Sequence, residues 1–382
     1  MSWEMMKLSE CCASIADGDH LPPPKADNGI PFVTIANINS TNQFDFSNTM
    51  FVPQEYYDKL DGKRKAQIGD VLYSVVGSFG IPVYIKNNKQ FVFQRHISIL
   101  RPNEKILPRF LYYTMLSRAF YAKADAAAIG AAQRTVSLTA LRNIEIEVPS
   151  IAEQNKIVDV LSAYDDLIED NQKQIKLLEE AAQRLYKEWF VDFHFPEHEN
   201  TPIIDGLPQG WSKRLIGDVI EKSYRSKQVM ASDYLKEGAI PIIDQSRDFI
   251  AGYTNDEETL VCLNKPVIVF GDHTRVLKYI QFPFAKGADG TQLILSNCEN
   301  MPQPLLYLSL QNVDLSNYHY ARHFKYLKAE EIIVPDVEVA NTFNNVITPI
   351  FQMVQIIREQ ITNAQQARDR LLPKLMSGEL EV

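Results

Sequence analysis

Residues 155–190 read NKIVDVLSAYDDLIEDNQKQIKLLEEAAQRLYKEWF, and residues 341–376, which lie 186 positions later, read NTFNNVITPIFQMVQIIREQITNAQQARDRLLPKLM. In both stretches apolar side chains recur at alternating intervals of three and four residues, the heptad pattern of a helix that packs along another helix. Each stretch therefore predicts one long helix. The first seam consists of Leu161, Tyr164, Ile168, Asn171, Ile175, Leu178, Ala182, Leu185 and Trp189. The second seam consists of Ile347, Ile350, Val354, Ile357, Ile361, Ala364, Arg368, Leu371 and Leu375.

Two such seams in one chain most simply pair with each other. A helix of roughly 35–40 residues is about 55 Å long, and antiparallel pairing would place the rest of the chain in two bodies at opposite ends. The alternative is that both stripes are core faces of ordinary globular helices. Pro349 predicts either a kink or a helix that begins near it, and Pro373 predicts a bend in the last turns.

The repeat extends beyond the two helices. The segment 146–149 recurs at 332–335 with the same shift of 186, whereas Trp3 near the start resembles Trp211, a shift of 208. The second globular half is therefore shorter than the first by the difference, 22 residues. The landmark residues match between the two halves, whereas the residues between them differ. This pattern is typical of two domains that have the same function but act on different targets. A tandem duplication without functional meaning is the alternative.

These landmarks divide the chain into a first globular domain (1–149), a first long helix (150–191), a connector (192–210), a second globular domain (211–335) and a second long helix with a tail (336–382). Both globular domains mix predicted strands and helices, so the expected fold class is α+β with pseudo-two-fold repetition. The expected elements are a strand within 69–77, a hairpin of 83–85 with 91–93, a helix over 109–128, strands over 266–271 and 276–282, and a helix over 304–311.

The composition is that of an ordinary soluble globular protein, with 23% charged residues and a net charge of −9. The acidity gathers in residues 150–210, so both globular domains are near neutral and could each present a basic face. Mean hydropathy is −0.20 and no apolar run approaches 18 residues, so no membrane span is expected. The start carries no basic segment followed by an apolar run, so no secretory signal is expected. Four cysteines without a CxxC pair favour a reducing cytoplasm.

Catalytic signatures are missing from the sequence. It contains no GxxxxGK[ST] phosphate loop, no GxGxxG before a helix, no HExxH, no GxSxG and no methyltransferase tetrapeptide. The GxxG segments at 77–80 and 287–290 are better explained as tight turns. His194 and His198 are four residues apart, but Pro196 between them opposes a shared helical face, so no metal site is expected. We therefore expect no catalysis, cofactor or metal in this chain.

The ends of the helical segments resemble a known family. Residues 149–158 resemble the start of the first spacer helix in specificity subunits of type I restriction–modification systems, and residues 184–193 resemble its end. Residues 370–380 are similar to the C-terminal segment of the same family. Together with the repeat, the resemblance covers the whole chain. One departure is that 336–341 lacks the Ala152-Glu153-Gln154 signature, which leaves open whether the two helices bind partners equally.

The resemblance implies a function and a set of partners. It implies two target-recognition domains on two antiparallel spacer helices, each domain reading one half of a split, non-palindromic site in double-stranded DNA. It implies that modification subunits bind S-adenosylmethionine and methylate adenine, and that restriction subunits supply cleavage driven by ATP and Mg. We further expect two modification subunits per chain, docked on the outer faces of the spacer helices at Tyr186, Trp189 and Phe190.

Residues that read DNA are expected among polar runs at matching places in the two domains. Base edges in the major groove are read by Arg, Asn, Gln and Thr, and phosphates are held by Lys, Arg, Ser and Thr. The candidates in the first domain are Ser74, Ser78, Gln94, Arg95, His96, Gln133 and Arg134. The candidates in the second domain are His273, Thr274, Arg275, Lys286, Tyr320, Arg322 and His323.

A function of a different class stays open at this point. The chain could be a DNA-independent scaffold whose coiled coil recruits partner helices, which would explain the acidic total but not the basic and aromatic cluster at 318–323. A chain that is itself a nuclease or methyltransferase is opposed by the missing motifs. Selection of a defined duplex from random DNA by the assembled complex would distinguish a DNA reader from a scaffold.

Overall fold

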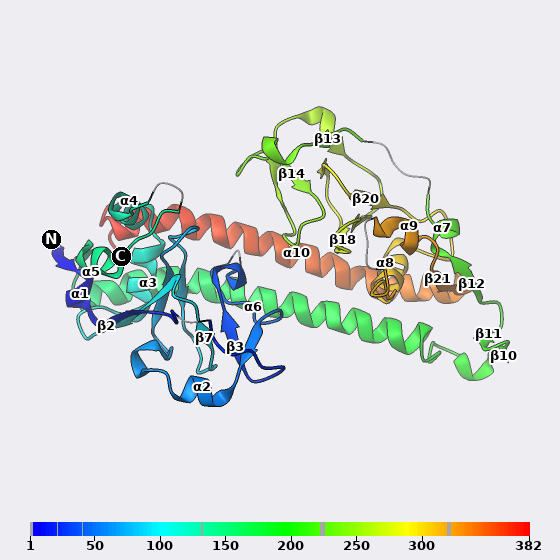
Figure 1. Cartoon of the computed structure of the whole chain (residues 1–382). Coiled ribbons are helices and arrows are strands. Elements are labelled where there is room, and N and C mark those ends of the chain that lie inside the picture. The colour runs from blue at the N-terminus through cyan, green and yellow to red at the C-terminus, as the bar shows by residue number, and fades with distance from the viewer. Residues whose placement is uncertain (1–2, 21, 40, 131–132, 222–225, 319–321) are drawn as a thin grey trace. The chain divides into compact units, whose positions relative to one another are not determined.

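A computed structural model describes residues 3–20, 22–39, 41–130, 133–221, 226–318 and 322–382 (Figure 1). The chain divides into two compact units, each described here by itself. Unit 1 comprises residues 1–169 and 362–382, and unit 2 comprises residues 170–361. Unit 1 is completed by a segment from the C-terminal end of the chain, whereas unit 2 is one continuous segment that begins and ends within long helices.

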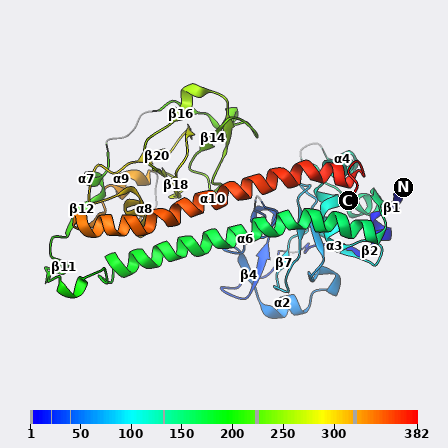
Figure 2. The same ribbon diagram turned by 180° about the vertical axis from the view of Figure 1, so that it is seen from behind.

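Two helices of 40 residues each, α6 (Ile151–Phe190) and α10 (Val337–Met376), are divided between the two units. Unit 1 contains the first half of α6 with the second half of α10, and unit 2 contains the two remaining halves. The helices therefore run antiparallel within each unit, as predicted, and both views show them side by side (Figures 1 and 2). The helix α10 begins well before Pro349 and continues through Pro373, so the predicted start near Pro349 is wrong.

Every residue of the two predicted seams is buried or half-buried. The two polar members are paired across the helices. In unit 2 the Asn171 Nδ2 donates to Gln360 Oε1 at 3.4 Å, and in unit 1 the Arg368 guanidinium contacts Asp165 Oδ1 at 2.7 Å. The seams also enter the globular cores, since Leu161 belongs to the unit 1 core and Ile347 to the unit 2 core. The two explanations of the stripes, helix pairing and core packing, are therefore both correct.

The globular part of unit 1 is built on a four-stranded sheet in the order β2-β8-β5-β6 and a three-stranded sheet in the order β4-β3-β7. Successive side chains of a strand point to opposite faces. Tyr73 of β5 therefore packs into the core shared with the helices, and Leu72 packs into the core between the sheets. The strands are β1 (Glu4–Lys7), β2 (Cys12–Asp17), β3 (Ile30–Val33), β4 (Met50–Val52), β5 (Val71–Ser74), β6 (Pro82–Tyr84), β7 (Val92–Phe93), β8 (Ile97–Pro102) and β9 (Glu145–Val148). The helices are α1 (Leu8–Cys11), α2 (Gln54–Asp58), α3 (Pro108–Leu116), α4 (Arg118–Ala127) and α5 (Leu138–Asn143), with 3-10 turns η1 (Ile35–Asn37) and η2 (Gly62–Arg64).

Unit 2 repeats this plan with a three-stranded sheet in the order β18-β17-β20 and a second sheet built around β19. The same alternation holds, because Phe270 of β17 faces the helices and Val269 faces the other sheet. The strands are β10 (Ile203–Ile204), β11 (Leu207–Pro208), β12 (Ser212–Leu215), β13 (Gln228–Val229), β14 (Ile240–Ile243), β15 (Gly252–Thr254), β16 (Leu260–Val261), β17 (Val267–Gly271), β18 (Leu277–Ile280), β19 (Phe284–Gly287), β20 (Thr291–Ile294) and β21 (Glu331–Val334). The helices are α7 (Ile216–Val219), α8 (Gln303–Gln311) and α9 (His323–Leu327), with 3-10 turns η3 (His198–Asn200), η4 (Ala231–Asp233) and η5 (Glu257–Thr259).

The sequence repeat is a structural repeat. In unit 1 the first strand β1 pairs antiparallel with β9, and in unit 2 β12 pairs in the same way with β21. The two tryptophans make equivalent hydrogen bonds, because the indole of Trp3 donates to Glu153 Oε1 and that of Trp211 to Asp336 Oδ2, both at 3.1 Å. Each bond ties the start of a domain to the start of a long helix.

Two local predictions are wrong. The strands β6 and β7 do not form a hairpin: β6 pairs with β5, whereas β7 pairs in parallel with β3. The predicted helix over 109–128 is two helices, because Ser117 adopts an extended backbone and its Oγ accepts from the Phe120 amide at 3.1 Å, which begins α4. Within the part of the chain that is described, no helix combines the length and apolar character needed to cross a membrane.

Candidate nucleic-acid interface

Three segments of unit 1 that carry predicted DNA contacts meet at one end of the four-stranded sheet. They are the turn between β5 and β6, the turn between β7 and β8, and the segment before α5. The Gly77 amide donates to the Arg134 carbonyl at 3.0 Å, and the Val75 amide donates to the His96 carbonyl at 2.8 Å. These backbone bonds bring together side chains that lie up to about 60 residues apart in the sequence.

Exposed side chains among these residues can contact DNA, whereas buried ones hold the turns in place. Ser78, Arg95, Gln133 and Arg134 are exposed, and Gln94 and His96 are half-buried. Ser74 is fully buried: its Oγ donates to the Ser78 carbonyl at 3.0 Å and accepts from the Ile81 amide at 2.9 Å. The prediction that Ser74 lies at a DNA-facing surface is therefore wrong, because the hydroxyl closes the turn that carries Ser78.

Two stacked aromatic rings lie beside Arg134. The rings of Phe79 and Tyr121 are stacked at 5.4 Å, and the Arg134 guanidinium lies 5.9 Å from the Phe79 centroid and 2.5 Å from Asp125 Oδ1. Gly80 has a φ of +98° and passes under the Tyr121 ring, where a Cβ would approach within 2.5 Å. Sequence reasoning missed Tyr121, which is 45% exposed; a large aromatic near the centre of a helix gave no sign of facing outward.

Unit 2 brings together the equivalent three segments. The turn between β17 and β18 holds Asp272 to Arg275, the turn between β19 and β20 holds Gly290, and His323 begins α9. The Asp272 amide donates to the Gly290 carbonyl at 2.7 Å, and the His323 amide donates to the Asp272 carbonyl at 2.9 Å. The same three segments therefore converge in both units.

The side chains in unit 2 again fall into two groups. His273, Thr274 and Arg322 are exposed and Arg275 is half-buried. His323 and Lys286 are 5% and 8% exposed. Lys286 lies within β19, and neither side chain is presented at the surface as predicted. The predicted contact Tyr320 lies outside the described residues.

Arg275 is held by the protein around it. It adopts a φ of +61°, which is rare for a residue with a side chain. Its Nη2 donates to the Tyr318 carbonyl at 2.6 Å, and its Nε donates to His323 Nε2 at 3.3 Å. As the acceptor in that bond, His323 is neutral, and its buried Nδ1 finds no partner among the described residues. Burial, together with the Arg275 guanidinium, lowers the pKa of His323.

We expect this arrangement to make unit 2 less stable in mild acid. Because the folded state has the lower histidine pKa, the unfolded chain binds more protons below the ordinary value of about 6.5. The contribution of neutral His323 is thus present above pH 6.5 and declines as the pH falls below it. Thermal unfolding between pH 5 and 7.5 measures the effect, and His323→Gln should flatten the profile. An unchanged profile in this variant would contradict the prediction.

Two residues that the sequence did not suggest hold the turns of unit 2 in place. The Gln245 Oε1 accepts from the His273 amide at 3.1 Å, and its Nε2 donates to the Asp289 carbonyl at 2.9 Å. The buried Lys278 donates to the Asp244 carbonyl at 2.9 Å, and burial lowers the pKa of Lys278 to about 8. In the sequence, only the position of Lys278 within an otherwise apolar strand could have indicated that these residues hold the turns.

Among the described residues, no group of three or more His, Cys, Asp or Glu side chains is arranged to hold a metal ion. The His194 and His198 rings lie 5.3 Å apart, and His198 Nδ1 contacts the Phe195 carbonyl. Burial raises the pKa of Cys11 to about 11, so this thiol is a core side chain and not a nucleophile.

Comparison with known proteins finds similarity to one family. Residues 1–180 match the family model described as the type I restriction modification DNA specificity domain. The chain is 28% identical over 308 residues to the type I restriction enzyme MjaIX specificity subunit of Methanocaldococcus jannaschii, which covers 74% of this chain and 71% of that protein. It is 28% identical over 185 residues to the HindI specificity subunit of Haemophilus influenzae, covering 46% of this chain and 40% of that protein.

The fold agrees with this match. The crystal structure of a type I restriction–modification S subunit from M. genitalium superimposes with a TM-score of 0.55 at 15% identity, covering 98% of this chain and 96% of that chain. At this identity the likeness concerns the fold alone, and it extends to both units and both long helices. The family model over residues 1–180, the whole-length fold match and the two-fold repeat agree with one another, and the chain is similar to the specificity subunits of type I restriction–modification systems.

Proposed function

We propose that this chain reads a split, non-palindromic site in double-stranded DNA, with one unit on each half of the site. The observation that carries the proposal is that the same three segments converge in both units while their exposed side chains differ. Unit 1 presents Arg95, Gln133 and Arg134, and unit 2 presents His273, Thr274 and Arg322. Because Arg selects guanine, Gln selects adenine and Thr contacts the thymine methyl group, two such sets favour two different base sequences.

In this proposal the chain itself carries out no reaction. Methylation of adenine is assigned to modification subunits that bind S-adenosylmethionine, and ATP and Mg are assigned to restriction subunits. The present chain supplies sequence selection and the scaffold on which those subunits assemble. The similarity to proteins named specificity subunits supports this division of labour.

The surface that we assign to the modification subunits differs from the one expected from the sequence. Tyr186, Trp189 and Phe190 are 6%, 7% and 1% exposed, and the Phe190 ring lies 4.8 Å from that of Phe343 inside unit 2. They are core residues of unit 2, so the prediction that they face a partner is wrong. These aromatic side chains pack the end of α6 against the globular part of unit 2.

Exposed apolar side chains lie instead on the outer sides of the helices. Each lies one position before a seam residue, and the 186-residue shift relates Ala163 to Pro349 and Leu167 to Met353. We define the outer stripe of α6 as Ala163 and Leu167, and the outer stripe of α10 as Val346, Pro349, Met353 and Ile356. Leu167, Val346 and Met353 are each 47% exposed and Ile356 is 49% exposed. Two related stripes, one in each unit, fit two copies of one partner, and we assign them to two modification subunits.

The experiment that tests the reading function is a domain exchange in the assembled complex. Replacing residues 1–149 with the corresponding domain of another specificity subunit should change one half of the selected target and leave the other half intact, because each unit contains its own converging segments. The target is found by selection from random duplexes and by mapping modified adenines. Exchange of 211–335 is the matched control and should change the opposite half.

Two outcomes would contradict the proposal. If both halves of the target changed together after one exchange, the assignment of one unit to one half-site would be wrong. If the complex with the native chain selected no duplex at all, the chain would be a scaffold and not a DNA reader.

A further inference from the structure

Each unit seats its globular part on the long helices through the same pair of tyrosines. In unit 1 the rings of Tyr84 on β6 and Tyr112 on α3 lie 6.2 Å apart, and in unit 2 those of Tyr279 on β18 and Tyr307 on α8 lie 5.2 Å apart. Both pairs are separated by the same 28 positions in the sequence. The seat is therefore part of the repeated frame, and differences around it are specific to each unit.

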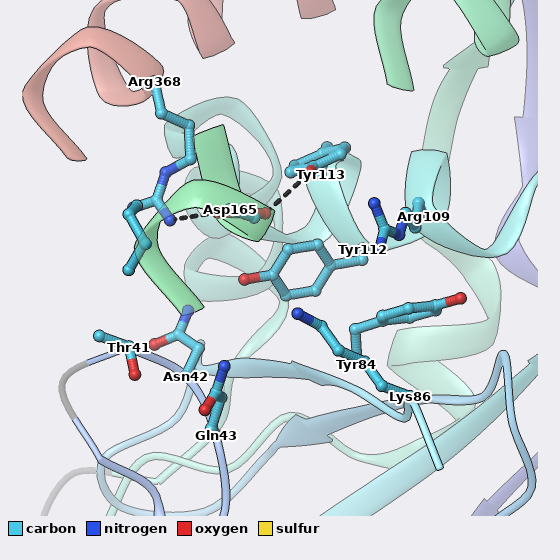
Figure 3. A pocket seen from close by; sticks show the side chains of 11 residues that line it. Thr41, Asn42, Gln43, Tyr84, Lys86, Arg109, Tyr112, Tyr113, Asp165 and Arg368 are labelled. Carbon is cyan, nitrogen blue, oxygen red and sulfur yellow. Dashed lines mark hydrogen bonds and ion pairs between the residues drawn. The ribbon is translucent and has the colours of Figure 1, made fainter. Parts of the chain in front are cut away.

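In unit 1 the seat is centred on a carboxylate of α6. The Tyr113 hydroxyl donates to Asp165 Oδ2 and the Arg368 guanidinium of α10 donates to Asp165 Oδ1, both at 2.7 Å (Figure 3). The side chains of Asp165 and Arg368 are only 16% and 15% exposed. Burial, reinforced by Asp165, raises the pKa of Tyr113, which keeps its hydroxyl a donor. One side chain thus joins the domain and both helices.

Charged pairs continue along the rim of this seat. The Arg109 guanidinium forms two bonds to the Asp166 carboxylate, at 2.9 and 3.2 Å, and Lys86 pairs with Glu169. The adjoining cavity is lined by Asn42, Tyr112 and Arg368 among others and measures about 30 Å³, which is room for about one water molecule. The seat is thus a packed joint and not a ligand site.

In unit 2 the equivalent positions carry different chemistry. The 186-residue shift replaces Asp165 with Phe351 and Arg368 with Ala182. The Phe351 ring packs on Tyr279 at 4.7 Å, and its carbonyl accepts from Gln281 Nε2 at 2.7 Å. The position of Asp165 is therefore taken by an aromatic ring in unit 2, where the ion pair between the helices is instead Arg358 with Glu179, at 2.7 Å beside Tyr307.

We infer that Asp165 is a positioning residue that fixes the first reading domain on the spacer helices and makes it specific for the first of the two seats. This rests on the proposed function. A buried carboxylate with two fixed donors holds one geometry, because leaving either donor unpaired is costly. The domain of unit 1, with Arg109 and Tyr113, matches the acidic seat and does not match the seat built around Phe351.

The test uses the full complex with modification subunits and DNA targets whose two blocks are separated by one base pair more or fewer than in the preferred target. The native complex should bind the altered spacings at least about tenfold more weakly. Asp165→Asn should keep the same bases in both blocks but bind the altered spacings within about threefold of the preferred one. Asp159→Asn, an exposed change on the same helix, is the matched control and should behave like the native chain.

A double-mutant cycle provides a second measurement. Combining Asp165→Asn with Arg368→Gln should restore part of the spacing preference, since neither buried charge is then left alone. If Asp165→Asn prevents assembly, Tyr113→Phe removes one hydrogen bond, keeps the ring and should loosen spacing in the same direction. Unchanged spacing preference in both variants overturns the inference. A native complex that selects no duplex would instead refute the proposed function.

Discussion

Replacing Met353 and Ile356 with glutamate should remove the modification subunit from unit 2 while the chain stays folded. Both side chains are about half exposed, so glutamate, a good helix former, is tolerated in the free chain. In the complex the same changes would bury two charges in an apolar contact, which weakens binding by roughly 100-fold or more. Native mass spectrometry of the purified complex should show one modification subunit per chain in place of two.

The same substitution can be made on the outer stripe of α6, which is related to that of α10 by the repeat. Leu167→Glu on the outer stripe of α6 should remove the other modification subunit, and the triple variant should remove both. Ile203→Glu introduces the same charge at a 58% exposed position in the strand β10 and should leave two subunits bound. Full occupancy in the triple variant would show that the outer stripes are not the docking surface, and a native complex with one modification subunit would count against the paired assignment.

Deleting residues 175–178 of α6 together with residues 361–364 of α10 should abolish assembly or shorten the preferred DNA spacing. Removing four residues shortens a helix by about 6 Å, nearly two base-pair steps. It also breaks the alternation of three and four residues along both seams, so the helices no longer present one continuous apolar face to each other. Selection from random duplexes with the purified variant complex measures the distance between the two blocks.

A seven-residue deletion is the control for this experiment. Removing 175–181 and 361–367 shortens both helices by about 10 Å but keeps the heptad phase. This variant should assemble better than the four-residue deletion and prefer blocks about three base pairs closer together. A surviving complex with unchanged spacing would show that the helices do not set the distance between the half-sites.

Features that depend on local periodicity could be determined from the sequence by itself. The seam from Leu161 to Trp189 and its copy from Ile347 to Leu375 predicted both long helices and their antiparallel pairing. This was possible because residues three or four positions apart lie on the same face of a helix. The matching places of the two polar runs followed from the same repeat. Strand partners did not, since β7 joins β3 across about 60 residues and its own turn gives no sign of that choice.

Only the tertiary structure decided which side chains lie inside. Ser74, Lys286 and His323 have the polar character expected of a DNA surface, yet neighbouring segments cover them. Trp189 was expected to face a partner but packs into its own unit, while less conspicuous residues such as Met353 remain exposed. The pairing of Asp165 with Arg368 joins positions 203 residues apart. Burial and ion pairing depend on residues from distant segments that folding brings together. A periodic pattern within one segment does not identify those residues.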